Sequence, residues 1–368
     1  MNELEQARVE IGNIDKQMAE LFERRMYAAS KVAEYKKEHG LSVKDKKREA
    51  ELIERNKGYI ENPEVGRYYY DFINNVIDLS CQYQTKLIEG VKVCYCGIEG
   101  AFGHAAAKKL FPEGELISVE DFTDAYKAVE NGECDMAVLP LENSYAGEVV
   151  NVMDLIFAGK LYINQVVNLP VVHSLVAKKG AKLSDIKTVV SHPQALRQCS
   201  NYCKKHGFEN KEYANTAMAA KYVSELDDIS VAAIASAETA ALYGLDVIEE
   251  EINDNKINTT RFAVFSRTKN DIYNHRHHSG VTDDVNFILV FTVRNEAGAL
   301  AQTLNIIGAH GFNMRSLRSR PMKDLQWNYY FYVEAEGNIN SENGRDMLQE
   351  LSAICAKLKL VGSFYSDN

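Results

Sequence analysis

An apolar stripe interrupted by a single cation is the feature that most constrains the start of this chain. Apolar residues recur at alternating steps of three and four, which is typical of an amphipathic helix with one packed face. Arg25 takes the place of one of them, where a buried cation costs several kcal/mol unless an anion pairs with it. The stripe therefore predicts a helix that helps to hold an anion. Its apolar members are Leu4, Ala7, Ile11, Ile14, Met18, Leu21, Ala28, Val32 and Tyr35.

The first 89 residues are predicted to be entirely helical, with breaks near Gly40, at Gly58 to Pro63 and at Gly90. Ser80 and Gln84 interrupt the apolar stripe of the third helix. Lys36 follows Arg25 by eleven residues, so both side chains share one face of the first helix. The pattern thus predicts that polar groups of different helices converge.

A second group of polar residues leaves two interpretations open. Asp45, Arg48 and Glu49 share one face of the second helix, and for them alone solvated surface ion pairs are the simpler interpretation. Arg25, Ser80 and Gln84 favour a binding site, because buried polar groups without partners are rare. Arg8 lies about a quarter-turn from Arg25 around the same helix, so we expect it to serve the pocket of a second copy.

Residues 4–88 resemble the all-helical chorismate mutases that are fused to enzymes of aromatic biosynthesis. The rearrangement of chorismate to prephenate needs no acid, base or nucleophile, only a held conformer and stabilised charge. The resemblance implies that Arg25, Arg48 and Arg8 of a second copy bind carboxylates. It also implies that Lys36 and Gln84 face the ether oxygen and that Asp45 and Glu49 lie near the hydroxyl. Ser80 completes the expected site.

The pattern changes after Gly90 to short apolar runs that alternate with helical stretches, which predicts an α/β region with a largely parallel sheet. Three polar loops follow these runs at residues 97–103, 141–147 and 191–194. Each alone is a helix cap, but together they can converge on a ligand rich in carboxylates. The predicted strands are residues 91–96, 136–139, 163–168, 172–177, 188–191, 231–235 and 262–266.

Residues 91–268 resemble prephenate dehydratases, through residues 97–102, 140–144, 191–194 with Gln198, and 260–262. The resemblance implies two α/β lobes like those of periplasmic binding proteins, the second at about residues 168–243, with the site between them. The reaction removes CO2 and water from prephenate and gives phenylpyruvate. Thr260 is the implied proton donor or orienter of the leaving hydroxyl. The other implied site residues are Asn143, Glu142, Gln198, Ser144, Ser191, His192, Arg261 and Phe262.

The C-terminal region follows a polar, His-rich segment, residues 269–284, which we interpret as a linker rather than a metal site. Residues 285–368 show the order βαββαβ, which is the ferredoxin-like split motif. They resemble an ACT domain, through Gly298-Ala299-Leu300 and Ser319-Arg320-Pro321, and the resemblance implies phenylalanine binding at these residues. Arg318 replaces the family's usual Glu. A dimerisation module without a ligand is the alternative.

Composition excludes several classes of partner and location. The net charge of −10 and the lack of a basic face argue against nucleic acid and anionic membranes. The first residues lack the regions of a signal peptide, and no apolar run approaches a membrane span. We expect the seven cysteines to be reduced thiols of a cytoplasmic protein, with Cys94 and Cys96 as packing residues. No metal or cofactor is expected.

The whole sequence is therefore predicted to combine an all-α domain, a two-lobed α/β domain and a ferredoxin-like α+β domain. It resembles the bifunctional chorismate mutase–prephenate dehydratases with a C-terminal ACT domain. The resemblance implies chorismate and prephenate as substrates, L-phenylalanine as effector, and a dimer or tetramer. Two alternatives stay open: a dehydratase whose helical part only clamps a dimer, and a ligand sensor without catalysis. Loss of mutase activity in Arg25→Ala excludes the first, and turnover of prephenate excludes the second.

Overall fold

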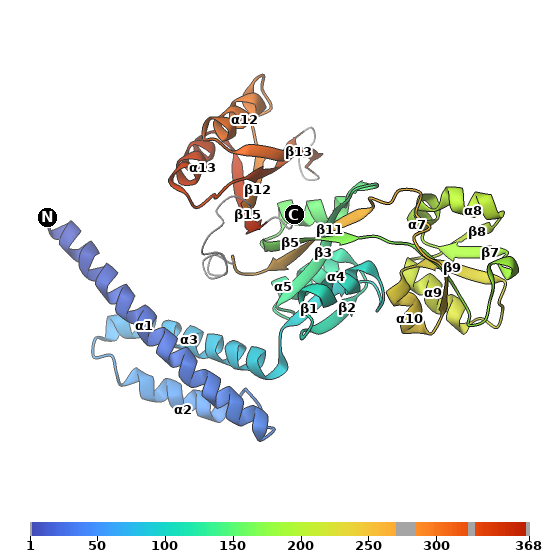
Figure 1. The fold of residues 1–368 in the computed structure, drawn as a ribbon. Coiled ribbons are helices and arrows are strands. Elements are labelled where there is room, and N and C mark those ends of the chain that lie inside the picture. Colours follow the sequence, from blue (N-terminus) through green and yellow to red (C-terminus); the bar gives the residue numbers. More distant parts are fainter. Residues whose placement is uncertain (1, 270–284, 323–327, 366–368) are drawn as a thin grey trace. The chain divides into compact units, whose positions relative to one another are not determined.

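A computed structural model describes residues 2–269, 285–322 and 328–365 of the chain (Figure 1). The chain divides into two compact units, Met1–Val91 and Lys92–Asn368, and each is described here by itself. Most of the predicted linker, with its histidines at positions 275, 277 and 278, lies outside the described residues.

The first unit is a three-helix assembly, as predicted, with helices α1 (Glu3–Glu38), α2 (Lys46–Lys57) and α3 (Pro63–Glu89). Each helix begins at a polar cap. The side chains of Asn2, Asp45 and Asn62 accept hydrogen bonds from backbone N–H groups of the first turn. These caps fix the helix starts, and Gly58 and Gly90 cap the ends of α2 and α3.

The apolar stripe of α1 is only partly packed within the single chain, so the predicted seam is incomplete in one copy and its remainder stays a prediction. Leu4, Ile11 and Leu21 are 59%, 57% and 58% exposed. The buried residues of α1 are Ala29 and Ala33. The physical reason is length, because the 36 residues of α1 outrun the 27 residues of α3 that pack against its second half.

The first lobe of the second unit is built on part of a ten-stranded mixed sheet. Strand β1 is parallel to β2 and β3, whereas β11 is antiparallel to β3 and β5. The prediction of a largely parallel sheet is therefore wrong for this lobe, because β11 returns from the second lobe in the opposite direction. The elements are β1 (Lys92–Cys96), α4 (Phe102–Leu110), β2 (Glu115–Val119), α5 (Phe122–Glu130), β3 (Met136–Asn143), β4 (Gly147–Glu148), α6 (Val150–Ala158), β5 (Tyr162–Pro170) and β11 (Thr259–Ser266).

The second lobe has its own five-stranded sheet in the order β10-β6-β9-β7-β8. Strand β10 adds an edge to it beyond residue 243, where the lobe was predicted to end. Two crossing segments join the lobes, one after β5 and one before β11. The elements are β6 (Ser174–Ala177), β7 (Thr188–Ser191), α7 (Pro193–Gln198), α8 (Ser200–His206), β8 (Glu209–Glu212), α9 (Thr216–Glu225), β9 (Val231–Ala235), α10 (Ala237–Tyr243) and β10 (Asp246–Glu249).

The C-terminal domain has the predicted order βαββαβ, and its sheet has two occupied faces. Phe287, Leu289 and Val333 pack with α12 and α13 on one face. Ile288 and Tyr332 join the core of the first lobe on the other face, and β15 pairs with β5 at its edge. The elements are β12 (Val285–Thr292), α12 (Ala299–Ala309), β13 (Asn313–Pro321), β14 (Tyr329–Glu336), α13 (Glu342–Ile354) and β15 (Lys357–Tyr365).

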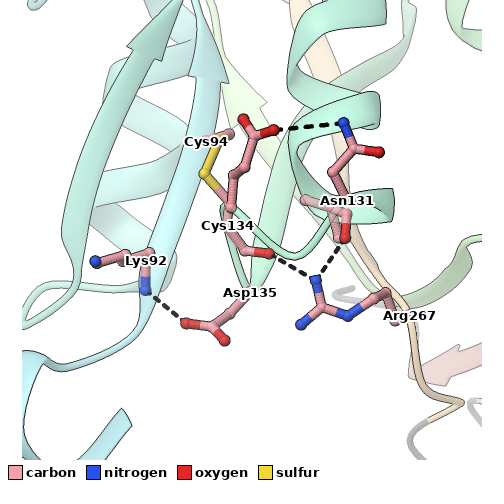
Figure 2. The surroundings of a disulfide bond; sticks show 8 residues. Lys92, Cys94, Asn131, Cys134, Asp135 and Arg267 are labelled. Carbon is pink, nitrogen blue, oxygen red and sulfur yellow. Dashed lines mark hydrogen bonds between the residues drawn. A yellow bond between two sulfur atoms is a disulfide. The ribbon is translucent and has the colours of Figure 1, made fainter. Parts of the chain in front are cut away.

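A disulfide joins Cys94 of β1 to Cys134, which precedes β3 (Figure 2). Both sulfurs are buried, and Arg267 closes the loop next to them by donating to the carbonyl of Cys134 at 3.1 Å. The prediction that all cysteines are reduced is therefore wrong for this pair. Sequence spacing hides the contact, because the two cysteines lie 40 positions apart and meet only when β1 and β3 pair.

Candidate active sites

A pocket of about 300 Å³ lies between the three helices of the first unit. It is lined by residues from α1, α2 and α3 and by the loop before α2. Seven of the predicted mutase residues line it, and only Arg8 does not, because it lies on the exposed first half of α1. The seven are Arg25, Lys36, Asp45, Arg48, Glu49, Ser80 and Gln84.

Arg25 enters this pocket as a partly desolvated cation. Its guanidinium donates to the hydroxyl of Ser80 and to the carbonyl of Val76 at 3.2 Å. Burial lowers the pKa of Arg25, although a guanidinium stays charged in proteins. Within the described residues no carboxylate forms an ion pair with it, so the pocket offers an uncompensated positive charge to an anion.

Lys36 and Gln84 meet on the opposite side of the same pocket. The Lys36 ammonium donates to Oε1 of Gln84 at 3.2 Å and to the carbonyl of Val43 at 2.6 Å. Asp45 is occupied as the cap of α2, and Arg48 forms an exposed pair with Glu51 at 3.4 Å. The buried part of the site therefore comes from α1 and α3, and α2 contributes its more exposed wall.

The dehydratase candidates Asn143 and Thr260 meet where β3 pairs with β11. The Asn143 Oδ1 accepts from the backbone N–H groups of Tyr145 and Ala146 at 3.0 and 2.9 Å, which fixes the orientation of the amide. Its Nδ2 then donates to the Thr260 hydroxyl oxygen at 2.9 Å and to Oδ1 of Asn258 at 2.8 Å. Because the Thr260 oxygen accepts a bond, its own O–H is left to donate.

Glu142 and Arg261 pair on the opposite face of the same two strands. Arg261 bonds to Glu142 at 2.7 Å and to both carboxylate oxygens of Glu334 at 2.7 and 3.0 Å. Burial raises the pKa of Glu142, but Arg261 and Arg318 together lower it by more than burial raises it, so the net shift of this pKa is downward. The structure thus brings Glu142 and Arg261 together but separates them from Asn143 and Thr260.

Several other predicted dehydratase residues already have structural partners. The Ser191 hydroxyl donates to the carbonyl of Ile234 at 2.7 Å, and His192 caps α7 through its ring Nδ1. Ser144 donates to the carbonyl of Ile257 at 3.0 Å, and Phe262 is buried. Their predicted contacts with substrate stay predictions.

Gln198 has one partner that the sequence did not indicate. Its Oε1 lies 2.8 Å from Nε2 of His173, a residue hidden in the predicted apolar run 172–177. His173 and Asn258 are both buried, with 2% and 4% of their surface exposed. The polar pair His173-Ser174 inside an apolar run was the sequence signal for His173. The position of Asn258 two residues before the 260–262 motif was the sequence signal for Asn258.

A small pocket of about 120 Å³ lies in the C-terminal domain, and of the six predicted effector residues only Leu300 lines it. Gly298 precedes α12 with a φ of +86°, a conformation that favours glycine, and Leu300 lines the pocket. Ser319 and Pro321 pair with Phe331 and Tyr329, which line it too. The remaining lining residues are Val293, Arg294, Asn295, Glu296 and Asn328.

Among the described residues, no group of three or more His, Cys, Asp or Glu side chains is placed to hold a metal ion. The described helices also include none that is long and apolar enough to cross a membrane.

Comparisons with known proteins match each part of the chain. Family models described as chorismate mutase type II, prephenate dehydratase and ACT domain match residues 7–85, 93–270 and 287–352. The bifunctional chorismate mutase/prephenate dehydratase of Enterobacter agglomerans is 31% identical, covering 100% of this chain and 97% of its own. Arogenate dehydratase 2 of Petunia hybrida is 32% identical, over 76% of this chain and 72% of its own. The crystal structure of prephenate dehydratase from Arthrobacter aurescens in complex with L-Phe is 29% identical, with a TM-score of 0.67, over 75% of this chain and 90% of its own.

Proposed function

Since this chain belongs to the family of bifunctional chorismate mutase/prephenate dehydratases, we propose how its own residues carry out the two reactions. The enzyme rearranges chorismate to prephenate and then converts prephenate to phenylpyruvate, under feedback by phenylalanine.

For the mutase reaction, Arg25 and Arg48 bind the carboxylates of chorismate. Lys36 and Gln84 face the ether oxygen, on which negative charge develops as the C–O bond breaks. Fixed donors in a partly desolvated pocket stabilise that charge more than water does. The contact that supports this role most directly is the bond from Lys36 to Gln84 at 3.2 Å.

Arg25→Ala tests the mutase site. We expect a loss of mutase activity of about 10²- to 10³-fold, with the dehydratase activity on added prephenate unchanged. Arg24→Ala is the matched control, because Arg24 is the neighbouring residue and is exposed. Full mutase activity in Arg25→Ala would favour the alternative in which the helical unit only clamps a dimer.

A second copy completes this site in our proposal. The exposed apolar residues of α1 need a cover, and Arg8 lies among them. Mixing Arg8→Ala with Arg25→Ala, after unfolding and refolding together, should restore mutase activity, since one pocket of each mixed dimer keeps both arginines. Failure to restore any activity would mean that each pocket is built from one chain.

For the dehydratase reaction, one observation carries the assignment: the bond from Asn143 Nδ2 to the Thr260 oxygen at 2.9 Å. It leaves the Thr260 proton directed elsewhere, and we assign it to the leaving hydroxyl of prephenate. The electrons of the breaking bond to the carboxylate pass through the ring and expel that hydroxyl as hydroxide, while CO2 is released. The bond from Thr260 stabilises the departing hydroxide, which becomes water by taking a proton from solvent. A neutral threonine is a weak acid, so its proton is shared with the leaving group rather than fully transferred.

Feeding chorismate alone to the purified protein tests the combined function. Phenylpyruvate should appear after prephenate, and phenylalanine should suppress it. Accumulation of prephenate without phenylpyruvate would contradict the dehydratase assignment.

We also propose that the protein works in the cytoplasm, because five of its seven cysteines are free. Quenching living cells with acid, alkylating the thiols after denaturation and analysing them by mass spectrometry tests this. All five should be alkylated, including the buried Cys199 and Cys203, and extensive disulfide formation among them would contradict the proposal.

A further inference from the structure

Two buried side-chain amides in the dehydratase domain have donor ends without partners. Gln198 and Asn258 are 5% and 4% exposed. No atom of the described chain accepts a hydrogen bond from Nε2 of Gln198 or from Nδ2 of Asn258. A buried donor without an acceptor is costly, so such groups in a native protein point to a bound acceptor.

In each amide the oxygen end is held by a neighbour. Oδ1 of Asn258 accepts from Asn143, and Oε1 of Gln198 faces Nε2 of His173 at 2.8 Å. Burial lowers the pKa of His173, so the ring is neutral and carries one proton. Because Oε1 can only accept, that proton sits on Nε2, and His173 is the donor.

His173 itself is held firmly at the crossing between the lobes. Its backbone N–H donates to Oδ1 of Asn253 at 2.6 Å, and its carbonyl accepts from Ile252 at 2.9 Å. The backbone of Asp254 in the same segment donates to the carbonyl of Gln198 at 2.7 Å. Phe102 packs against the imidazole at a ring distance of 5.9 Å. Both partners of the bond between His173 and Gln198 are thus fixed by one crossing segment.

We propose that His173 is a positioning residue for the dehydratase reaction. It holds the oxygen of Gln198, so that the amide turns its two N–H groups towards a carboxylate of prephenate. The opposite amide orientation would direct a carbonyl oxygen at a dianion. The proposal rests on the proposed role of Gln198 in substrate binding, and it adds the residue that sets the direction of that amide.

The test replaces His173 by Phe, which keeps a ring but removes the donor, and by Gln, whose amide nitrogen can replace Nε2. We expect His173→Phe to raise the KM for prephenate by about 10- to 100-fold, because a bond to a charged group is lost, with a much smaller change in kcat. His173→Gln should recover most of this loss. Cooperative urea unfolding of the second unit, which carries His173, at the midpoint of the parent protein reports that this unit has folded.

A double-mutant cycle separates positioning from a general structural role. If His173 acts through Gln198, then His173→Phe should add no further loss to Gln198→Leu. Additive losses, or a normal KM in His173→Phe, would overturn the proposal. If Gln198→Leu itself has a normal KM, then the substrate-binding role of Gln198 fails instead, so the two failures can be told apart.

Charges of alternating sign form a chain across the contact between the C-terminal domain and the first lobe. We call this chain the interdomain ladder. Arg318 pairs with Glu142, and Arg320 lies 3.5 Å from Glu148 and 3.4 Å from Asp154. In order, the members are Glu334, Arg261, Glu142, Arg318, Glu148, Arg320 and Asp154.

Members of the ladder in each of the two domains lie one residue away from a predicted site. On β13, Arg318 and Arg320 face the first lobe, whereas Ser319 pairs with Phe331 beside the effector pocket. On β3, Glu142 faces the ladder, and the next residue, Asn143, holds Thr260. Neighbouring residues of a strand share one backbone, so a displacement of one residue also displaces the next.

We also infer that the interdomain ladder transmits effector binding to the dehydratase site through Glu142. Arg318, which stands where the family usually has Glu, therefore takes part in this coupling. This inference rests on the proposed effector pocket. A direct measurement of phenylalanine binding shows whether the pocket or the ladder has failed.

Arg318→Gln is the test, with Arg315→Gln as the matched control. Arg315 lies on the same strand but pairs with Glu336 of its own domain. We expect Arg318→Gln to bind phenylalanine normally by calorimetry but to need at least about 10-fold more for half-inhibition, since coupling energies run from about 1 to 3 kcal/mol. Unchanged inhibition in Arg318→Gln would overturn the ladder, and equal loss in Arg315→Gln would make it a general charge effect.

Discussion

The two faces of the strand pair β3 and β11 use different chemistry within two residues of each other. On one face, Asn143 donates neutral hydrogen bonds to Thr260 at 2.9 Å and to Asn258 at 2.8 Å. On the other, Glu142 and Arg261 meet as an ion pair that continues into the C-terminal domain. The register of the strands places Thr260 opposite Asn143 and Arg261 opposite Glu142, so alternation alone separates the two sets.

This difference shows how catalysis and regulation can share one structural element. Neutral groups with fixed direction suit the transfer of a proton, because they keep their geometry without demanding counter-charges. Charges suit contact between domains, because breaking one pair leaves a costly unpaired partner. Changes on the neutral face should therefore affect turnover, and changes on the charged face should affect stability and feedback.

The largest expected effect comes from Thr260→Val, which keeps the shape of the side chain and removes its proton. Dehydratase turnover should fall by about 10²- to 10⁴-fold, the usual contribution of a positioned proton donor. Formation of phenylpyruvate from prephenate measures it. Thermal stability should change little.

Thr260→Ser is the control for that prediction, because it keeps the hydroxyl. It should retain most of the activity. If Thr260→Val turned over prephenate normally, the neutral face would have no special part in the chemistry and the comparison would break.

The next effect in size is on the charged face, in Glu334→Gln. Glu334 is 3% exposed and binds Arg261 through both oxygens, so its loss leaves a buried guanidinium half paired. We expect the second unit to lose about 2–3 kcal/mol of unfolding free energy, somewhat less than a fully broken buried pair because Glu142 still binds Arg261. Urea unfolding followed in that unit measures the change. A loss of turnover without a loss of stability would reverse the roles of the two faces.

Acid should weaken the charged face before the neutral one. The folded pKa of Glu142 lies below its ordinary value, so this carboxylate contributes stability that is complete above about pH 4.5 and is lost as the pH falls through the folded pKa. The slope of unfolding free energy against pH below about 4.5 should therefore be smaller in Arg318→Gln than in the parent protein. Identical slopes in the two proteins would mean that Arg318 does not hold the carboxylate.

Local patterns in the sequence predict much of this molecule. The helix breaks near Gly58 and Gly90 and the element order of the C-terminal domain follow from spacing within one or two elements. For the helical pocket, spacing alone favours a site only for Arg25, Ser80 and Gln84, and the resemblance to chorismate mutases supplies the other lining residues. Strand alternation also places Asn143 and Thr260 on one face once their pairing is known.

The features that the sequence could not predict depend on contacts between distant segments. The disulfide between Cys94 and Cys134 requires β1 and β3 to be neighbours. The partner of Arg261 is Glu334, which lies 73 positions away in another domain. The 260–262 motif indicates that Arg261 is functional, but only the packed structure shows that its guanidinium is already paired with Glu142 and Glu334.

The smallest expected effect sharpens the comparison by removing an exposed charge that lines the same cavity as Glu142 and Arg318 but pairs with Glu336 instead. Arg315 and its partner Glu336 are 58% and 32% exposed, so water screens their attraction. Exposed pairs are usually worth less than about 1 kcal/mol, and Arg315→Gln should lower the unfolding free energy by no more than that. Urea unfolding and phenylalanine inhibition should both match the parent protein within error. A loss as large as that of Glu334→Gln would mean that burial does not separate these pairs, and the special status of the charged face would then have to be given up.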